Sequence, residues 1–397
     1  MEKIVFCLMI FFLLVTSEYQ RACYIFGGDI SYINSIRLDP ENYIPGLCTH
    51  IYYKGGILNK HHVAEPDHPA EVFNGIYEGN YARFVKLKEK QPGLKIILSF
   101  TVNDILKSSM KKMLSTLKKR RKFIKSAIEL VNENHFDGID IDLDFPDSRH
   151  KRKFATFIKE LRNAAKDKII TLKVSGFESS IDHGYDVPSL AKLVDFLNVE
   201  TYNYLGSDFG VKHHSPLYFH QNDSFNFSAS HALNFWAKKG MPKEKLLMGI
   251  ATYGMGWKLK NPQETGVGSC AKDDFPEQKY TNSDGIAAYY EICKLNGKIF
   301  WDMDTQVPYI VSNDLWYGYD DVQSIELKMK WIKENGFGGA FVDQLDYDDF
   351  IGICNSEEKY PLTTIVKKSL EQSSNMTFIN ETLSTGKLFY ETFSRYQ

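Results

Sequence analysis

Three aspartates at alternate positions are the residues of this chain best placed to do chemistry. Asp140, Asp142 and Asp144 are separated by Ile141 and Leu143 in the segment FDGIDIDLDFP, which begins at position 136. A period of two is typical of a β-strand, so the three carboxylates share one face of that strand. Neighbouring carboxylates on such a face lie roughly 7 Å apart, which lets each perturb the pKa of the next where water is excluded. Coupled carboxylates of this kind are suited to acid–base chemistry.

Folding alone does not require carboxylates at these positions, because aspartate is a poor strand former and like charges repel each other. An acidic edge strand that faces solvent is the alternative interpretation. The flanking Gly138 and the apolar face formed by Ile139, Ile141, Leu143 and Phe145 favour a buried strand instead. The sequence therefore predicts that the three carboxylates line a site.

The elements that must position these carboxylates can be recognised from the pattern of apolar residues. Eight strand-like runs cover residues 22–26, 50–57, 94–101, 137–145, 169–177, 196–204, 246–253 and 339–345, and most gaps between them have apolar residues at helical spacing. Strands that alternate with helices predict an α/β fold, the (β/α)8 TIM barrel. An open doubly wound sheet is the alternative, but no glycine-rich phosphate loop follows the first run.

Three segments do not fit the predicted barrel, which we place at about residues 22–370. The apolar run within residues 1–17 is typical of a secretory signal peptide, with an uncleaved anchor as the alternative. The gap at about residues 254–319 is too long for an ordinary barrel loop, so we predict a small α+β insertion subdomain between strands 7 and 8. Residues 371–397 are rich in Ser, Thr and Asn and are expected to form a polar C-terminal tail.

Composition limits the classes of partner. The chain has 397 residues and a formal net charge of -2, so no overall charge attracts it to nucleic acid or to an anionic membrane. No later segment resembles a transmembrane helix. The histidine pairs at 61–62 and 213–214 lack partners at ligand spacing, and no dinucleotide fingerprint is present, so we expect no metal and no cofactor. We expect a secreted, extracellular monomer.

Cysteines and glycosylation sequons agree with export. Cys7 lies in the predicted signal peptide, which leaves five of the six cysteines for the mature chain. In an oxidising compartment this number predicts two disulfides and one unpaired thiol. Four N-x-Ser/Thr sequons predict a glycoprotein, with acceptors at Asn222, Asn226, Asn375 and Asn380.

Motifs along the chain resemble glycoside hydrolase family 18, the chitinases and chitinase-like lectins. The fourth-strand signature of that family is Asp-Gly-x-Asp-x-Asp-x-Glu, and residues 137–144 follow it except at the last position. Other matching segments are LCTH at 47–50, SPLY at 215–218, TYG at 252–254, YYEIC at 289–293 and DYDDF at 346–350. The resemblance covers about residues 22–370. It implies the disulfides Cys23–Cys48 and Cys293–Cys354, with Cys270 as the odd thiol.

The resemblance also implies a mechanism and its catalytic residues. In this family a Glu protonates the glycosidic oxygen while the sugar's own N-acetyl carbonyl attacks the anomeric carbon and gives an oxazolinium intermediate. Asp140, Asp142 and Tyr202 occupy the supporting catalytic positions, and Asp144 occupies the position of the acid. Because Asp is one methylene shorter than Glu, its carboxyl is withdrawn by roughly 1.5 Å. A displacement of about 1 Å can cost on the order of a hundredfold in rate.

Four positions are assigned to substrate binding by the resemblance: Tyr24, Lys54, Asn203 and Asp343. Three of them depart from the family pattern. Lys54 replaces an aromatic residue, Asn203 replaces the Asp of a Met-x-Tyr-Asp motif, and Asp343 replaces the Trp that forms the floor under the sugar. Because these changes converge on one pocket while the barrel segments remain intact, the resemblance implies a chitinase-like pseudoenzyme that is impaired or inactive in hydrolysis.

Three functions remain open from the sequence. The first is binding of a chitin-type N-acetylglucosamine oligosaccharide or of a protein partner without hydrolysis. The second is a slow chitinase, or a hydrolase of another N-acetylated glycan, that uses Asp144 as its acid. The third is a signalling or host-modulating ligand that binds no sugar at all.

One electrostatic prediction follows from two charges that replace aromatic residues. Lys54 and Asp343 should both point to the mouth of the barrel, where Asp142 and Asp144 also point. An unpaired charge in so confined a site is costly, so we predict that Lys54 pairs with at least one of these carboxylates and lowers carboxyl pKa values. The alternative is a Lys54 side chain that extends into solvent.

Overall fold

The computed structural model describes residues 18–27, 36–73, 75–76, 78–102, 107–143, 146–204, 210–220, 226–355 and 357–372. Two segments predicted from the sequence therefore lie largely or wholly outside the described residues: the signal peptide at 1–17 and the polar tail at 371–397. Within the described ranges, no helix has both the length and the apolar character needed to cross a membrane.

Eight parallel strands form a closed ring, as the sequence predicted. They are β1 (Gln20–Phe26), β2 (His50–Leu58), β4 (Lys95–Thr101), β5 (Gly138–Asp142), β6 (Ile169–Ser175), β7 (Phe196–Glu200), β8 (Leu246–Ala251) and β14 (Gly339–Asp343). The hydrogen-bonded order runs β1-β14-β8-β7-β6-β5-β4-β2, and pairing of β1 with β2 closes the ring. The short β3 (Ala64–Pro66) pairs antiparallel with β2 outside the ring. This arrangement confirms the (β/α)8 TIM barrel.

Several strands end earlier than their apolar runs suggested. The fourth, sixth and eighth runs continue to positions 145, 204 and 345, whereas β5, β7 and β14 end at 142, 200 and 343. After β7, Asn203 has a φ of 60°, which is incompatible with a strand. The seventh run is split at Thr252, because Tyr253 starts a new strand in a different sheet. Apolar periodicity thus continues beyond the ring, into the segments that line its mouth.

Side chains alternate between the inside of the barrel and the layer of helices around it. Tyr24, Tyr52 and Phe341 belong to a small cluster inside the ring. Their chain neighbours, such as Cys23 and Ile51, belong to the larger core between strands and helices. Because a strand has a period of two, every second residue of each run faces inward. This alternation determines which polar residues reach the interior.

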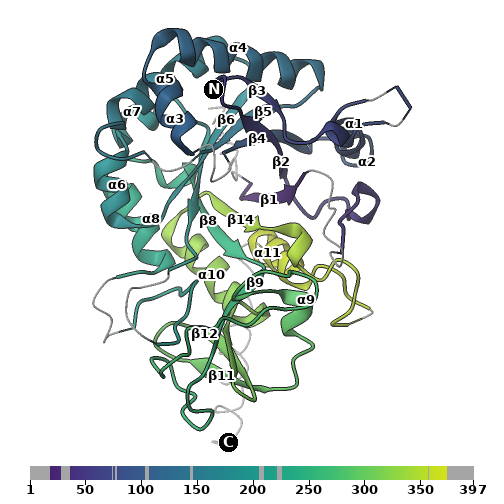
Figure 1. Ribbon diagram of the computed structural model, residues 1–397, viewed down its shortest axis with the longest axis vertical. Coiled ribbons are helices and arrows are strands. Elements are labelled where there is room, and N and C mark those ends of the chain that lie inside the picture. The colour runs from purple at the N-terminus through teal and green to yellow at the C-terminus, as the bar shows by residue number, and fades with distance from the viewer. Residues whose placement is uncertain are drawn as a thin grey trace, which may run out of the picture.

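Helices cover the outside of the ring (Figure 1). They are α1 (Asn80–Val85), α2 (Leu87–Lys90), α3 (Lys107–Leu114), α4 (Leu117–Glu133), α5 (Lys151–Ala164), α6 (Glu178–Gly184), α7 (Val187–Leu190), α8 (Ala229–Lys238), α10 (Val322–Asn335) and α11 (Pro361–Glu371). The sequence explains α5, whose buried Phe154, Phe157, Ile158 and Leu161 recur at helical spacing. It also explains α10, where the Asp321 side chain caps the first turn and Gly336 ends the helix with a φ of 71°.

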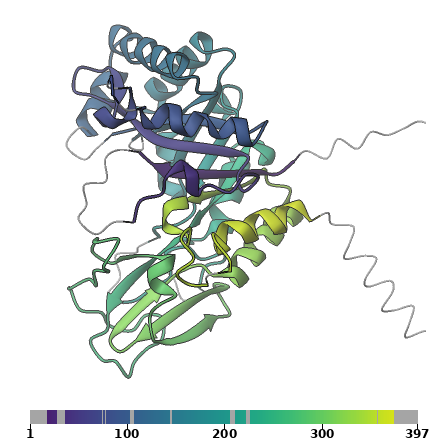
Figure 2. The same ribbon diagram turned by 90° about the vertical axis from the view of Figure 1, so that its right-hand side faces the viewer.

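The predicted insertion forms a second sheet between β8 and β14. Its strands are β9 (Tyr253–Lys258), β10 (Ile286–Ala288), β11 (Lys298–Asp302), β12 (Val307–Ser312) and β13 (Leu315–Gly318), and α9 (Tyr289–Ile292) follows β10. The antiparallel order is β10-β9-β13-β12-β11. Two views related by 90° show this sheet at one end of the molecule, with the barrel at the other (Figures 1 and 2).

Two disulfides join these parts. Cys23–Cys48 links β1 to the residue that lies two positions before β2, and Cys293–Cys354 links the end of α9 to the segment after β14. These are the pairs that the family resemblance implied, and Cys270 is free and exposed. Closing a loop in this way typically contributes about 2–4 kcal/mol to stability. The second bridge therefore helps to hold the insertion against the barrel.

Candidate functional site at the mouth of the barrel

The predicted site residues converge on the end of the ring where the parallel strands terminate. Asp142 ends β5, Asp343 ends β14 and Lys54 is the last residue of β2 that pairs with β1. Tyr202 and Asn203 follow β7 by two and three residues. Side chains at the carboxyl ends of barrel strands form the functional face of this fold. The structure thus brings together residues that are up to 319 positions apart, as from Tyr24 to Asp343.

Asp140 lies deepest and is completely buried. Its carboxylate accepts hydrogen bonds from Tyr24 Oη at 3.0 Å, Ser99 Oγ at 2.7 Å and Thr171 Oγ1 at 2.6 Å. Tyr24 Oη in turn accepts a hydrogen bond of 2.8 Å from Asn198 Nδ2. Burial, together with the charge of Asp142, raises the pKa of Asp140 to about 6 in spite of these donors.

The predicted ion pair of Lys54 is confirmed. Lys54 Nζ lies 3.1 Å from Asp142 Oδ2, and both side chains are largely buried. The ammonium also lies 4.9 Å from the ring centroid of Phe26, at the rim of the mouth. Lys54 therefore does not extend into solvent. The predicted lowering of a carboxyl pKa is found at Asp343, where Lys173 and Lys54 both contribute.

Lys173 is the residue that sequence reasoning missed. It lies on β6 and is only 8% exposed. Its Nζ is 2.8 Å from Asp343 Oδ2, 3.8 Å from Glu200 Oε1 and 3.9 Å from Asp142 Oδ2. Its inward position becomes evident only from the register of the two strands. Thr171 pairs with Asp140 across β5 and β6, so Lys173, two residues further along, must face inward beside Asp142.

The two lysines change the acid–base properties of the carboxylates around them. Burial alone would raise the pKa of Asp343, but Lys173 and Lys54 outweigh it and lower that pKa to about 2. The pKa of Glu200 is raised because burial outweighs the attraction of Lys173. Burial also opposes the charge of Lys173, yet Asp142, Asp343 and Glu200 raise its pKa well above the usual value. The mouth thus contains two lysines and three carboxylates that lie within ion-pair distance of one another. We call this set the charge network: Lys54, Lys173, Asp142, Glu200 and Asp343.

The hydroxyl of Tyr202, the tyrosine assigned to catalysis, also has a hydrogen-bond partner within the protein. Tyr202 Oη donates a hydrogen bond to Asp343 Oδ2, and the Tyr202 side chain is buried. Asn203 points elsewhere, because its Oδ1 accepts a hydrogen bond of 2.8 Å from Tyr253 Oη. Tyr253 begins the insertion, so Asn203 connects the mouth of the barrel with the second sheet. Neither polar group is left without a partner inside the protein.

Some predicted residues lie outside the described part of the chain. Asp144, which occupies the acid position, is one of them, and so are the sequon residues Asn222, Asn375 and Asn380. Asn226 is described and half-buried, and its Oδ1 accepts a hydrogen bond of 3.0 Å from Ser228 Oγ. Glycosylation stays a prediction. In the described part of the chain, no group of three or more His, Cys, Asp or Glu residues is arranged to hold a metal ion.

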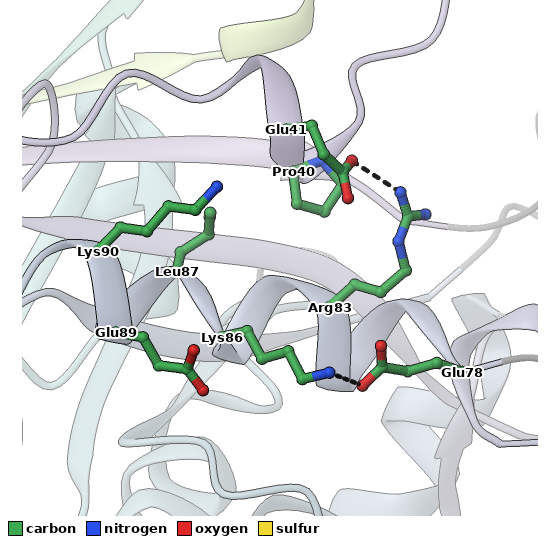
Figure 3. A pocket seen from close by; sticks show the side chains of 8 residues that line it. All are labelled: Pro40, Glu41, Glu78, Arg83, Lys86, Leu87, Glu89 and Lys90. Atoms are coloured by element: carbon green, nitrogen blue, oxygen red, sulfur yellow. Dashed lines mark hydrogen bonds and ion pairs between the residues drawn. The ribbon is translucent and has the colours of Figure 1, made fainter.

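A separate pocket on the outer surface does not compete with the mouth as a candidate site. It is lined by residues of α1, α2 and the neighbouring segments, mostly charged ones (Figure 3). Arg83 pairs with Glu41 at 2.8 Å and Lys86 pairs with Glu78 at 2.6 Å across its walls. Solvent-exposed pairs of this kind contribute little and are typical of an ordinary protein surface.

The raised pKa of Asp140 predicts a specific pH dependence of stability. The folded pKa is about 6, against about 3.9 for an unfolded Asp. A raised carboxyl pKa contributes stability that is present below about pH 4 and is lost as the pH rises through 6, on the order of 2–3 kcal/mol in total. Denaturant unfolding of the Asp140→Asn variant should therefore show a deficit against the native protein that shrinks between pH 4.5 and pH 7. The same substitution at the exposed Asp273 is the control, and an Asp140→Asn deficit that grows over this range would contradict the assignment.

Comparison with known proteins agrees with the barrel fold. The model of the Glycosyl hydrolases family 18 matches residues 20–348. A probable endochitinase of Caenorhabditis elegans is 35% identical over 377 residues, which cover 89% of this chain and 61% of that protein. The chain thus spans less than two thirds of that relative.

Two solved structures are similar over the whole of their own chains. An immunomodulatory active chitinase from Trichuris suis superposes with a TM-score of 0.82 at 33% identity, covering 89% of this chain and 100% of that chain. Human YKL-39 gives the same TM-score, identity and coverage, and is described as a pseudo-chitinase with retained chitooligosaccharide-binding properties. The similar proteins thus include both a chitinase and a pseudo-chitinase.

Proposed function

Because the chain belongs to the Glycosyl hydrolases family 18, we propose that it is a secreted chitinase-like protein that binds chitin-type N-acetylglucosamine oligosaccharides without hydrolysing them. The observation that carries this proposal is the charge network. Side chains that would serve the sugar in a hydrolase of this family are bound to one another instead. The proposal includes removal of residues 1–17 and glycosylation of the exported chain.

Each supporting role in substrate-assisted hydrolysis conflicts with a contact in the network. Asp142 would have to orient the acetamido group, but its carboxylate is paired with Lys54. Tyr202 would have to donate its hydroxyl to the acetamido oxygen, but that hydroxyl donates to Asp343. A site whose polar groups are already paired offers no preorganised stabilisation to a transition state. Loss of hydrolysis follows from this arrangement, in addition to the shortened acid at Asp144.

An exposed aromatic residue at the rim of the mouth is compatible with sugar binding. Phe26 ends β1 beside Lys54 and is 48% exposed. Aromatic rings present an apolar face on which a pyranose ring can pack. The retained chitooligosaccharide binding of the pseudo-chitinase YKL-39 supports this part of the proposal.

Binding at the rim predicts a loss of affinity when Phe26 is truncated. Isothermal titration of the purified protein with the N-acetylglucosamine tetramer should show binding that Phe26→Ala weakens by about tenfold, since a buried aromatic contact is worth on the order of 1–2 kcal/mol. Phe275→Ala is the matched control, because Phe275 is similarly exposed at 45% but belongs to the insertion. Equal affinities of the native protein and both variants would remove Phe26 from the binding site.

Recognition of a protein partner is the second candidate function. It is favoured by the charge network, which occupies the mouth of the barrel. If the charge network leaves no room for a sugar, the protein must act through another kind of recognition. The similar structure from Trichuris suis is described as an immunomodulatory chitinase, which shows that such a role occurs on a closely similar fold. Absence of any tetramer binding by the native, correctly folded protein would favour this candidate over the first.

A further inference from the structure

We propose that Lys173 is the specificity-determining residue that excludes an N-acetylated sugar ring from the centre of the barrel mouth. The inference deepens the proposed function and rests on it only in taking a chitin-type glycan as the ligand. It assigns the exclusion to one side chain, which the family resemblance did not place in the site.

The contacts of Lys173 place its ammonium near the axis of the ring. The side chain starts on β6, and its Nζ reaches Asp142 at the end of β5, Glu200 at the end of β7 and Asp343 at the end of β14. In the ring, β7 and β8 separate β6 from β14. A side chain that contacts both must extend across the mouth and not along its wall. It therefore occupies the space that a ring bound at the centre would need.

The aromatic rings of the centre are covered by the same group. Lys173 Nζ lies 5.4 Å from the ring centroid of Tyr24 and 5.7 Å from that of Tyr202. Their hydroxyls donate to Asp140 and Asp343 respectively. Both the faces and the polar tips of these tyrosines thus have partners within the protein. A sugar at the centre would have to replace these contacts as well as displace the lysine.

Displacement of Lys173 is unfavourable because it would leave the Asp343 carboxylate without its closest ion-pair partner. Asp343 is 7% exposed and depends on Lys173 for its closest ion pair. An incoming neutral sugar cannot replace that charge, and separating a buried pair is costly. Lys54 is less suited to the same role. Its contact with the exposed Phe26 places it toward the rim, from where it can reach solvent without crossing the mouth.

The test removes Lys173 together with Asp343, the carboxylate that lies closest to its ammonium; we call these two residues the blocking pair. The Lys173→Ala/Asp343→Asn variant should bind the N-acetylglucosamine tetramer at least tenfold more tightly than the native protein in isothermal titration. The matched control is Lys272→Ala/Asp314→Asn, which removes an exposed pair with the same 2.8 Å separation and should leave affinity unchanged. Circular dichroism establishes that each variant is folded. A folded blocking-pair variant with native affinity would overturn the proposal.

A second, conservative variant keeps the proposal testable if the double variant does not fold. Lys173→Gln keeps a polar side chain that can still donate a hydrogen bond to Asp343, but it is shorter and carries no ammonium. If Lys173 keeps the sugar out of the centre, the shorter side chain frees part of that space, and the tetramer should bind at least threefold more tightly than to the native protein. Native affinity in a folded Lys173→Gln variant would overturn the inference while leaving the binding function intact. Native protein that binds no tetramer, with binding gained in the double variant, would overturn the binding function and leave the inference intact.

Discussion

Replacing Lys173 with methionine is expected to lower the free energy of unfolding by about 3–5 kcal/mol at pH 7. Methionine has a similar length but no charge, so Asp343 and Glu200 would lose the ammonium that lies between them. Lys54 can balance only one of the remaining carboxylates, and it is already paired with Asp142. Equilibrium unfolding in denaturant measures the loss.

The loss should depend on pH in a defined direction. In the native protein the pKa of Asp343 is lowered to about 2, so its stabilising contribution is present above about pH 4 and is lost only as the pH falls through 2. In the variant the folded pKa values of Asp343 and Glu200 rise, and protonation relieves the repulsion as the pH falls. The deficit should therefore be smaller at pH 4 than at pH 7.

A matched control separates the buried network from surface electrostatics. Lys272 pairs with Asp314 at 2.8 Å, the separation found for Lys173 and Asp343, but its side chain is 45% exposed. Lys272→Met should lower the free energy of unfolding by less than about 1 kcal/mol, because solvent screens an exposed ion pair. Equal losses for the two lysine variants would show that Lys173 does not hold the mouth together.

Restoring the length of the acid is expected to have no large effect on catalysis. Asp144→Glu restores the side-chain length that the family uses for its acid. Taken alone, this change would raise the rate of hydrolysis on the order of a hundredfold. The supporting groups remain engaged, since Asp142 is paired with Lys54 and Tyr202 donates to Asp343. We therefore expect turnover of N-acetylglucosamine oligomers to stay within tenfold of the native protein. Hydrolysis of a fluorogenic oligomer measures it.

The interpretation of that experiment depends on the background rate. Asp144→Ala removes the carboxyl and gives the rate without an acid at this position. If native protein, Asp144→Glu and Asp144→Ala all give this background, the charge network is sufficient to abolish hydrolysis. A gain above a hundredfold in Asp144→Glu alone would show that the shortened acid, and not the network, is the cause.

Sequence alone predicted the barrel because its strands and helices have different apolar periods. It also predicted that Lys54 would pair with a carboxylate, since two charges stood where the family has aromatic residues. Lys173 was missed because a lysine within a strand of alternating character resembles a surface residue. Only the register of β6 against β5 places it opposite Asp142. Which side chains belong to such a network depends on which strands face one another across the barrel axis. The local sequence pattern does not encode that arrangement.

The buried pair of Lys328 and Asp320 illustrates the same limit. Lys328 on α10 donates to both carboxylate oxygens of Asp320 at 2.6 Å and to the carbonyl of Ser215 at 2.7 Å. Both charged side chains are completely inaccessible to solvent. In the sequence Lys328 is one of several charged residues of a helix. The pair becomes evident only when the segment after β13 folds against α10.

The most direct test of the central claim is incubation of the purified native protein with the N-acetylglucosamine hexamer, with products followed by mass spectrometry. We propose that the mouth is occupied by its own charges, so no shorter oligomers should appear above the background of the Asp142→Ala/Asp144→Ala variant. An active chitinase under the same conditions verifies the substrate. Cleavage of the hexamer by the native protein at a rate that the double variant abolishes would contradict the account.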